Sequence, residues 1–270
     1  MVYQWLKNNL FLHDLPKNCL LCEQLLPLEA IKPDSSSLYI NPELLTPRTH
    51  TTLLCSGCFE KLPRINSSCF RCAIGIPEFA SMPENPTLIC GACIANNPLQ
   101  YRAISPLAYL FPVPELISRM KFRRDLSYLG LLAMVFTQHT QACYRNDRLP
   151  ECIIPVPLHP NREFVRGFNQ AELLAHQVGK SLHIPCDTSV LKRTRNTPSQ
   201  MQLSIPERER NMKKAFALAR TSRPVHYQHV TIFDDVFTTG ATTQSMARVL
   251  LNAGCQRVDI WSIARTPKPE

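Results

Sequence analysis

Eight cysteines in the first part of the chain form four Cys-x-x-Cys pairs, a spacing typical of metal ligands. The pairs are Cys19/Cys22, Cys55/Cys58, Cys69/Cys72 and Cys90/Cys93. Each pair supplies two thiolates, so two pairs complete a tetrahedral zinc site. The last two pairs are 17 residues apart, which is usual for such a site, whereas 32 residues separate Cys22 from Cys55. The spacing predicts one or two zinc ions, and it leaves open whether neighbouring or alternate pairs combine.

A redox role for these cysteines fits the sequence less well than a metal role. A thioredoxin-type motif needs one Cys-x-x-Cys pair at the start of a helix in an α/β setting. Here four pairs occur in a proline-rich segment with few long apolar runs. Bound metal would supply folding energy that such a core-poor segment lacks.

A second stretch, VTIFDDVFTTGATT over residues 230–243, places two adjacent acids before a threonine-rich loop with one glycine. The backbone N–H groups of such a loop, and of the helix that follows it, bind anions. Asp234 and Asp235 cannot bind the same phosphate, but they suit sugar hydroxyls or a hydrated magnesium ion. A ribose 5-phosphate would satisfy both halves. The alternative is a threonine-rich helix cap after a core strand, and no Walker sequence is present.

Basic residues are concentrated in the second part of the chain. Residues 1–100 hold 7 Lys and Arg against 8 Asp and Glu, whereas residues 101–270 hold 23 against 13. This imbalance indicates a polyanionic partner, such as a phosphate, a nucleotide or a nucleic acid. A generic basic surface is the alternative.

Alternating strand and helix patterns over residues 151–270 predict an α/β fold. Buried strands are expected at 152–158, 230–235 and 258–265, with helices at 169–183 and 241–254. This order favours a mainly parallel sheet with helices on both faces, in which ligands bind at the carboxyl ends of the strands. One or two further amphipathic helices are expected between residues 98 and 150. The predicted domains are therefore 1–97, with the cysteine pairs, and 98–270.

The remaining bulk properties indicate a soluble cytoplasmic protein without membrane insertion. The 270 residues are 44% hydrophobic, which is enough to bury a core. No apolar run approaches the roughly 20 residues that span a bilayer. The first residues lack the organisation of a signal peptide.

VTIFDDVFTTGATT resembles the 5-phosphoribosyl-1-pyrophosphate (PRPP) signature of type I phosphoribosyltransferases. This resemblance implies that Asp234 and Asp235 bind the ribose hydroxyls. It also implies that one loop binds the 5-phosphate through Thr238, Thr239, Gly240, Ala241, Thr242 and Thr243. Magnesium would accompany PRPP.

The stretches PVPLHPNREFVRGFNQAELL and RTRNTPSQMQLSIPERERNMKKAF, behind four cysteine pairs, resemble the ComF/GntX family. The resemblance covers nearly the whole chain except residues near 30–50. It implies a type I phosphoribosyltransferase-like parallel sheet flanked by helices, with a small N-terminal cysteine-rich zinc-ribbon module. It also implies an association with natural competence and with incoming single-stranded DNA.

Further basic residues are candidate contacts for PRPP or DNA. Arg162 and Arg166 follow a buried strand in the loop that faces the pyrophosphate in type I enzymes, although they also fit a solvated helical face. Lys121 could contact either ligand. Arg193 and Arg195 begin a segment that Pro198 and Pro206 interrupt, which predicts a mobile loop. The candidates for nucleic-acid binding are Arg123, Arg124, Lys213 and Lys214.

These observations favour a PRPP-binding protein that handles single-stranded DNA in natural competence. The alternative is an active phosphoribosyltransferase in nucleotide or base salvage, using PRPP and magnesium. The sequence names no catalytic residue and no acceptor. A competence helicase or another DNA-processing protein is a candidate partner for the cysteine module.

Overall fold

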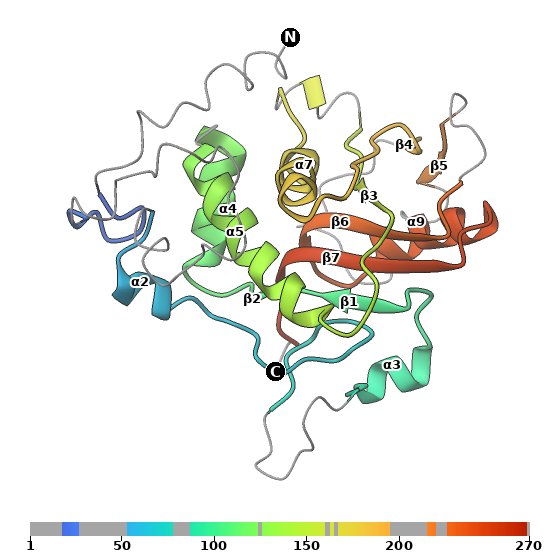
Figure 1. The fold of residues 1–270 in the computed structure, drawn as a ribbon, viewed down its shortest axis with the longest axis horizontal. Coiled ribbons are helices and arrows are strands. Elements are labelled where there is room, and N and C mark those ends of the chain that lie inside the picture. Colours follow the sequence, from blue (N-terminus) through green and yellow to red (C-terminus); the bar gives the residue numbers. More distant parts are fainter. Residues whose placement is uncertain are drawn as a thin grey trace.

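The computed structural model describes residues 18–26, 53–77, 87–123, 126–159, 163–164, 167–194, 215–219 and 226–268, without the side chains of 121–126. Figure 1 shows a main sheet with helices packed on it, and α2 and α3, which belong to the segments with the paired cysteines, at its periphery. The helices are α2 (Ser56–Glu60), α3 (Gly91–Asn96), α4 (Val113–Arg123), α5 (Leu126–Cys143), α7 (Gln170–Leu182) and α9 (Ala241–Asn252). The strands are β1 (Arg102–Ile104), β2 (Leu107–Ala108), β3 (Cys152–Pro155), β4 (Leu191–Arg193), β5 (Phe216–Leu218), β6 (His229–Phe237) and β7 (Arg257–Arg265).

The main sheet is parallel throughout, in the order β1-β7-β6-β3, with β2 also paired to β7. Its two central strands, β6 and β7, have nine residues each and are rich in β-branched and aromatic side chains. The carboxyl ends of these strands meet at one edge, which we call the carboxyl edge. The loop that follows β6 therefore lies beside the segments that follow β2 and β7.

Side chains alternate between the two faces of the sheet and build a separate core on each. Ile153, Phe233 and Trp261 pack with α4, α5 and α7 on one face. Their neighbours Ile154, Ile232 and Ile260 pack with α9 on the other face (Figure 1). Helices on both faces of a parallel sheet confirm the predicted α/β class.

The structure also corrects two strand boundaries and adds a ribbon. The strand at 230–235 continues to Phe237, because β7 offers hydrogen-bonding partners as far as Arg265. The strand predicted at 152–158 ends at Pro155. β4 and β5 form an antiparallel ribbon that the sequence did not predict. Across the described ranges of the chain, no helix is long and apolar enough to cross a membrane.

Candidate metal centres and anion-binding loop

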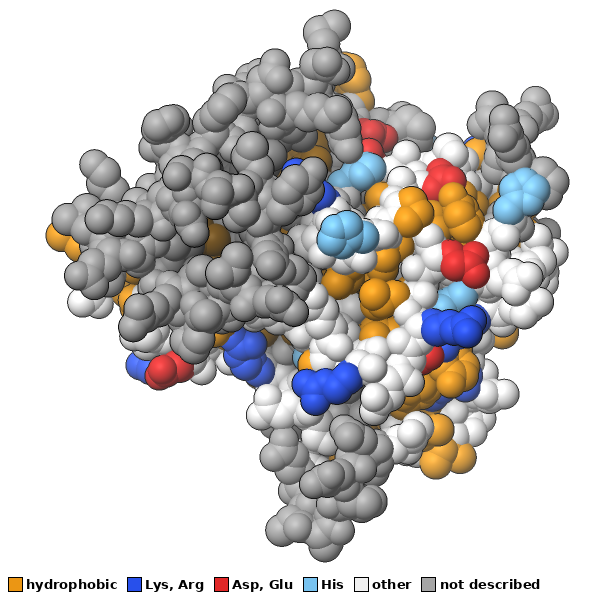
Figure 2. All heavy atoms as spheres, in the orientation of Figure 1, with side chains coloured by type: hydrophobic (Ala, Val, Ile, Leu, Met, Phe, Trp, Pro, Cys, Tyr) orange, Lys and Arg blue, Asp and Glu red, His pale blue; other side chains and the backbone are white. Residues whose placement is uncertain are grey.

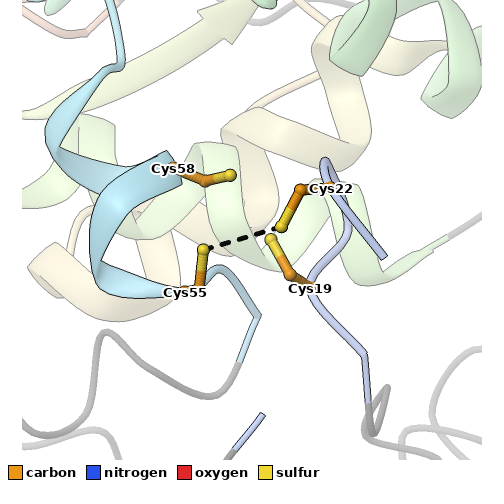
Figure 3. Close-up of side chains that lie close together, drawn as sticks. All are labelled: Cys19, Cys22, Cys55 and Cys58. Atoms are coloured by element: carbon orange, nitrogen blue, oxygen red, sulfur yellow. Dashed lines mark hydrogen bonds between the residues drawn. The ribbon is translucent and has the colours of Figure 1, made fainter. Parts of the chain in front are cut away.

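The eight cysteines of the four pairs lie in two groups of four, each formed by pairs that are neighbours in the sequence. We call Cys19, Cys22, Cys55 and Cys58 the first tetrad, and Cys69, Cys72, Cys90 and Cys93 the second tetrad. In each tetrad the sulfur atoms lie within 4.8 Å of one another. Figure 3 shows the four side chains of the first tetrad pointing toward a common centre. This pairing decides between the two arrangements that the sequence left open.

The distances within both tetrads fit a tetrahedral zinc–thiolate site. The Cys22 and Cys55 sulfurs are 3.7 Å apart, as are those of Cys72 and Cys90. A tetrahedron with zinc–sulfur bonds of about 2.3 Å has sulfur–sulfur edges of about 3.8 Å. All twelve cysteines of the chain are free thiols, so no disulfide competes for these sulfurs. Either tetrad could therefore bind a zinc ion.

The electrostatics of the tetrads also favour a bound cation. A hydrogen bond from Cys72 lowers the pKa of the Cys69 thiol to about 4. The same pairing, together with burial, raises the pKa of Cys72. Burial likewise raises the pKa of Cys58 in the first tetrad. Crowded thiols thus oppose one another's ionisation, and a divalent cation at the centre would stabilise all four thiolates.

The first tetrad packs on the helices. Cys19 is buried in the same core as α4 and α5, and the Leu20 N–H donates to the carbonyl of Leu53 at 3.0 Å. The hydroxyl of Tyr128 on α5 donates to the carbonyl of Leu20 at 3.2 Å and accepts from Arg119 on α4. This tetrad therefore sits on the α4–α5 pair.

The second tetrad packs on the sheet. The Ala103 N–H of β1 donates to the carbonyl of Phe70, which lies between two of the ligands, at 2.9 Å. The Phe70 ring meets Tyr101 edge-on, with centroids 5.4 Å apart. The buried Gln100 side chain donates to the carbonyl of Arg71 at 2.6 Å. The loop of Cys69 and Cys72 is thus hydrogen-bonded along the edge strand of the sheet.

The threonine-rich loop connects β6 to α9 at the carboxyl edge. Gly240 takes a left-handed conformation, with φ of 84°, immediately before the first residue of α9. A Cβ atom there would lie 2.9 Å from the Phe237 ring, so the turn requires glycine. The first turn of α9 has no acidic residue, and the N-terminus of a helix attracts anions. This arrangement is the predicted strand, loop and helix.

The hydroxyls of the loop do not all have the same surroundings. Thr239 is exposed, and its hydroxyl oxygen accepts from the Ala241 N–H at 3.4 Å. Thr243 is buried, and its hydroxyl donates to the carbonyl of Gly240 at 3.0 Å. Thr243 therefore braces the turn, whereas Thr239 faces solvent and Thr238 and Thr242 are half-buried.

Asp234 and Asp235 are half-buried near the end of β6. Phe233 and Val236 both pack toward the α5 face, whereas Phe237 packs toward the α9 face, so the alternation of the strand is interrupted at the aspartates. One carboxylate oxygen of Asp234 accepts from the Asp235 N–H at 2.8 Å. Both residues lie in β6, two and three residues before its end at Phe237, and the two-part pocket stays a prediction.

The other predicted contacts are placed only in part. Arg193 lies in β4, with its guanidinium 5.5 Å from the centre of the Phe216 ring. The other predicted basic contacts lie outside the described residues, or their side chains are not described: Lys121, Arg123, Arg124, Arg162, Arg166, Arg195, Lys213 and Lys214. On the face shown in Figure 2, the Lys and Arg side chains that are described lie apart from one another and form no continuous patch.

Sequence reasoning missed Arg265, the last residue of β7. Its guanidinium donates to the carbonyl of Phe237 at the end of β6, to that of Thr238 in the loop, and to that of Cys72 in the second tetrad. The available signal was a charged residue directly after the buried run VDIWSIA, at the carboxyl end of a central strand.

Comparison with known proteins reveals clear relatives. The chain is 34% identical to "Competence protein F" of Haemophilus influenzae over 218 residues, which cover 78% of this chain and 90% of the relative. The chain belongs to the ComF family. It is also 35% identical to "DNA utilization protein YhgH" of Escherichia coli K12, covering 79% and 90% of the two chains.

Comparisons with more distant proteins add less information about this chain. "Competence protein ComFC" of Bacillus subtilis is 27% identical and covers 74% of this chain and 79% of its own. No family model matches the sequence. A purine phosphoribosyltransferase structure from Pyrococcus horikoshii covers 62% of this chain and 94% of its own at 15% identity. Its TM-score is 0.28, and a likeness of that size carries no weight for the site.

Proposed function

We propose that this ComF-family protein binds PRPP with magnesium at the carboxyl edge and handles single-stranded DNA in natural competence. The observation that carries the pocket is the sequence of parts at the end of β6. There, two half-buried carboxylates are followed by a glycine turn and by the N-terminus of a twelve-residue helix. Carboxylates accept from ribose hydroxyls, and a helix N-terminus binds phosphate.

The proposed DNA role rests on charge and on the relatives. Residues 101–270 carry 23 basic against 13 acidic residues, which suits a polyanion. The relatives are named for competence and DNA utilization. Zinc in the two tetrads would hold the cysteine segments in shape, and their outer surface remains a candidate docking site for a DNA-processing protein.

Isothermal titration calorimetry with PRPP and magnesium tests the pocket. The double variant Asp234→Asn/Asp235→Asn should lose PRPP binding while its zinc content is unchanged. Asp187→Asn is the matched control. Asp187 follows Cys186, which forms a β-bridge with Ile153 in the amino half of β3, away from the loop, and its carboxylate accepts from the Ser189 N–H. Unaltered affinity in the double variant would mean that the pocket lies elsewhere.

Fluorescence anisotropy with labelled oligonucleotides tests the DNA role. Binding to single strands should show little sequence preference and should weaken steeply between about 50 and 200 mM salt. No binding at low salt, or binding that salt leaves unchanged, would contradict the proposal. Release of pyrophosphate from PRPP in the presence of free bases or DNA would favour the alternative, an active phosphoribosyltransferase.

A further inference from the structure

The second tetrad and the threonine-rich loop share one side chain. Arg265 Nε donates to the carbonyl of Cys72 at 2.8 Å, and Arg265 Nη1 donates to the carbonyl of Phe237 at 2.9 Å and to that of Thr238. Arg265 lies 193 residues from Cys72 in the sequence. One guanidinium therefore joins a backbone carbonyl of a candidate metal ligand to the first carbonyls of the loop.

These hydrogen bonds also orient the loop. In a trans peptide unit the C=O and the N–H point in opposite directions. Because Arg265 draws the carbonyls of Phe237 and Thr238 toward itself, the N–H groups of Thr238 and Thr239 point away from it. An anion site needs such N–H groups turned outward together. The Thr266 N–H also donates to the Phe237 carbonyl, at 3.1 Å, so Arg265 and Thr266 together hold the first peptide unit, and Arg265 holds the carbonyl of Thr238.

Packing extends the same connection to the glycine turn. The Arg265 guanidinium lies 4.7 Å from the centre of the Phe237 ring. A Cβ atom added at Gly240 would lie only 2.9 Å from a carbon of the same ring, so the turn packs tightly against it. A continuous series of contacts therefore leads from the second tetrad to the start of α9. It runs from the carbonyl of Cys72 through Arg265 and the Phe237 ring to Gly240.

A second route joins the same two places independently. Gln244 in α9 accepts from the Leu99 N–H at 3.0 Å, and its amide nitrogen donates to the Gln100 side chain. Gln100 is 1% exposed and donates to the carbonyl of Arg71, between Cys69 and Cys72, at 2.6 Å. Both the loop and the first turns of α9 are thus hydrogen-bonded to the second tetrad.

We propose that the second tetrad, through Arg265 and Gln100, positions the threonine-rich loop, so that metal binding there sets the order and anion affinity of the loop. Arg265 is a positioning residue. The inference rests on the proposed function only where it concerns PRPP. The first tetrad, which packs on α4 and α5, has no part in it.

Hydrogen–deuterium exchange of the full protein, without ligand, tests this coupling. Arg265→Gln should raise exchange across residues 236–246 on the order of tenfold, as expected for the loss of one or two charge-assisted hydrogen bonds. Arg265→Lys keeps the charge without the planar fork, so it should not restore protection. Arg257→Gln is the matched control, because this arginine begins β7 and pairs with Asp147 and Asp259 instead.

The second part of the exchange experiment removes each candidate metal site in turn. Cys90→Ser and Cys55→Ser should each lower zinc content by one ion per chain, but only Cys90→Ser should raise exchange in 236–246. Retained protection in 230–233 and 258–263 would show that each variant folds. Equal loop exchange in the two variants, or a loop unchanged in Arg265→Gln, would overturn the inference.

PRPP affinity separates this inference from the proposed function. Arg265→Gln and Cys90→Ser should weaken PRPP binding on the order of tenfold, while Cys55→Ser should not. If the wild-type protein does not bind PRPP at all, the proposed function fails, but the exchange results still decide the coupling. If PRPP binds the wild type and all three variants equally, the inference fails and the proposed function stands.

Discussion

The first tetrad rests on two helices, whereas the second is hydrogen-bonded to a sheet edge and to the loop that follows β6. Both have four thiols from neighbouring Cys-x-x-Cys pairs, and both show a sulfur–sulfur distance of 3.7 Å. Their contacts differ, because Tyr128 connects the first tetrad to α5 while Arg265 connects the second to Thr238. The same set of four thiols thus lies on a pair of helices in one place and beside a candidate binding loop in the other.

Removal of both metals should have the largest effect. Structural zinc in small peptide domains is bound with about 10–16 kcal/mol of apparent free energy, most of which is folding energy. Chelation should therefore unfold the segments at 18–26, 53–77 and 87–97 first. Limited proteolysis followed by mass spectrometry would show cleavage there before any cleavage in β6 or β7. An unchanged proteolysis pattern after complete zinc removal would contradict the prediction.

Leu54→Ala should have the next largest effect, on the side of the first tetrad. Leu54 is fully buried in the core that includes α4 and α5, and leucine truncation in a core typically costs about 2–5 kcal/mol. Urea unfolding should show this loss of stability, while exchange in the threonine-rich loop stays at the wild-type level. A more mobile loop in this variant would remove the distinction between the two tetrads.

Gly240→Ala should affect the loop side by about 1–3 kcal/mol, because alanine is strained at positive φ and its Cβ meets the Phe237 ring. Calorimetry should show that PRPP binding is lost, whereas the zinc content of the variant should equal that of the wild type. Gly130→Ala in α5 is a suitable control, since a Cβ at Gly130 meets nothing within 4 Å. Normal PRPP affinity in Gly240→Ala would show that the turn does not shape the pocket.

Tyr128→Phe should have the smallest effect, about 0.5–1.5 kcal/mol. The change removes the hydroxyl that joins Arg119 to the carbonyl of Leu20, next to the first tetrad. Thermal unfolding should show the shift, and PRPP affinity should not change. A loss of affinity as large as that expected for Arg265→Gln would indicate that both tetrads communicate with the loop.

Much of the fold was predictable because its signals are local. The helix predicted at 169–183 is α7, and Asn169 caps it by accepting from the Ala171 N–H. The buried runs of β3 and β7 predicted a sheet covered on both faces. The β4–β5 ribbon was missed because its strands have three residues each and pair across a long intervening segment.

The backbone geometry of the candidate site, a strand followed by a glycine turn and a helix, was predictable for the same reason. Asp234, Asp235 and the glycine turn are contiguous in the sequence, so residue type and order were enough to infer their chemistry. The pairing of the cysteines could not be inferred, because both arrangements satisfy the spacing of the four pairs. The part played by Arg265 was equally hidden, since its partners are 27, 28 and 193 residues away.

The sequence by itself determined the candidate ligand chemistry of this protein: thiol pairs with the spacing of metal ligands, and carboxylates before a loop of the kind that binds anions. Those properties depend on residue type and short spacing, which any chain with these motifs would share. Only the tertiary structure decided which cysteines share a centre and that one centre is hydrogen-bonded to the loop. Such contacts form because the parallel sheet brings the end of β7 between segments that are distant in the chain.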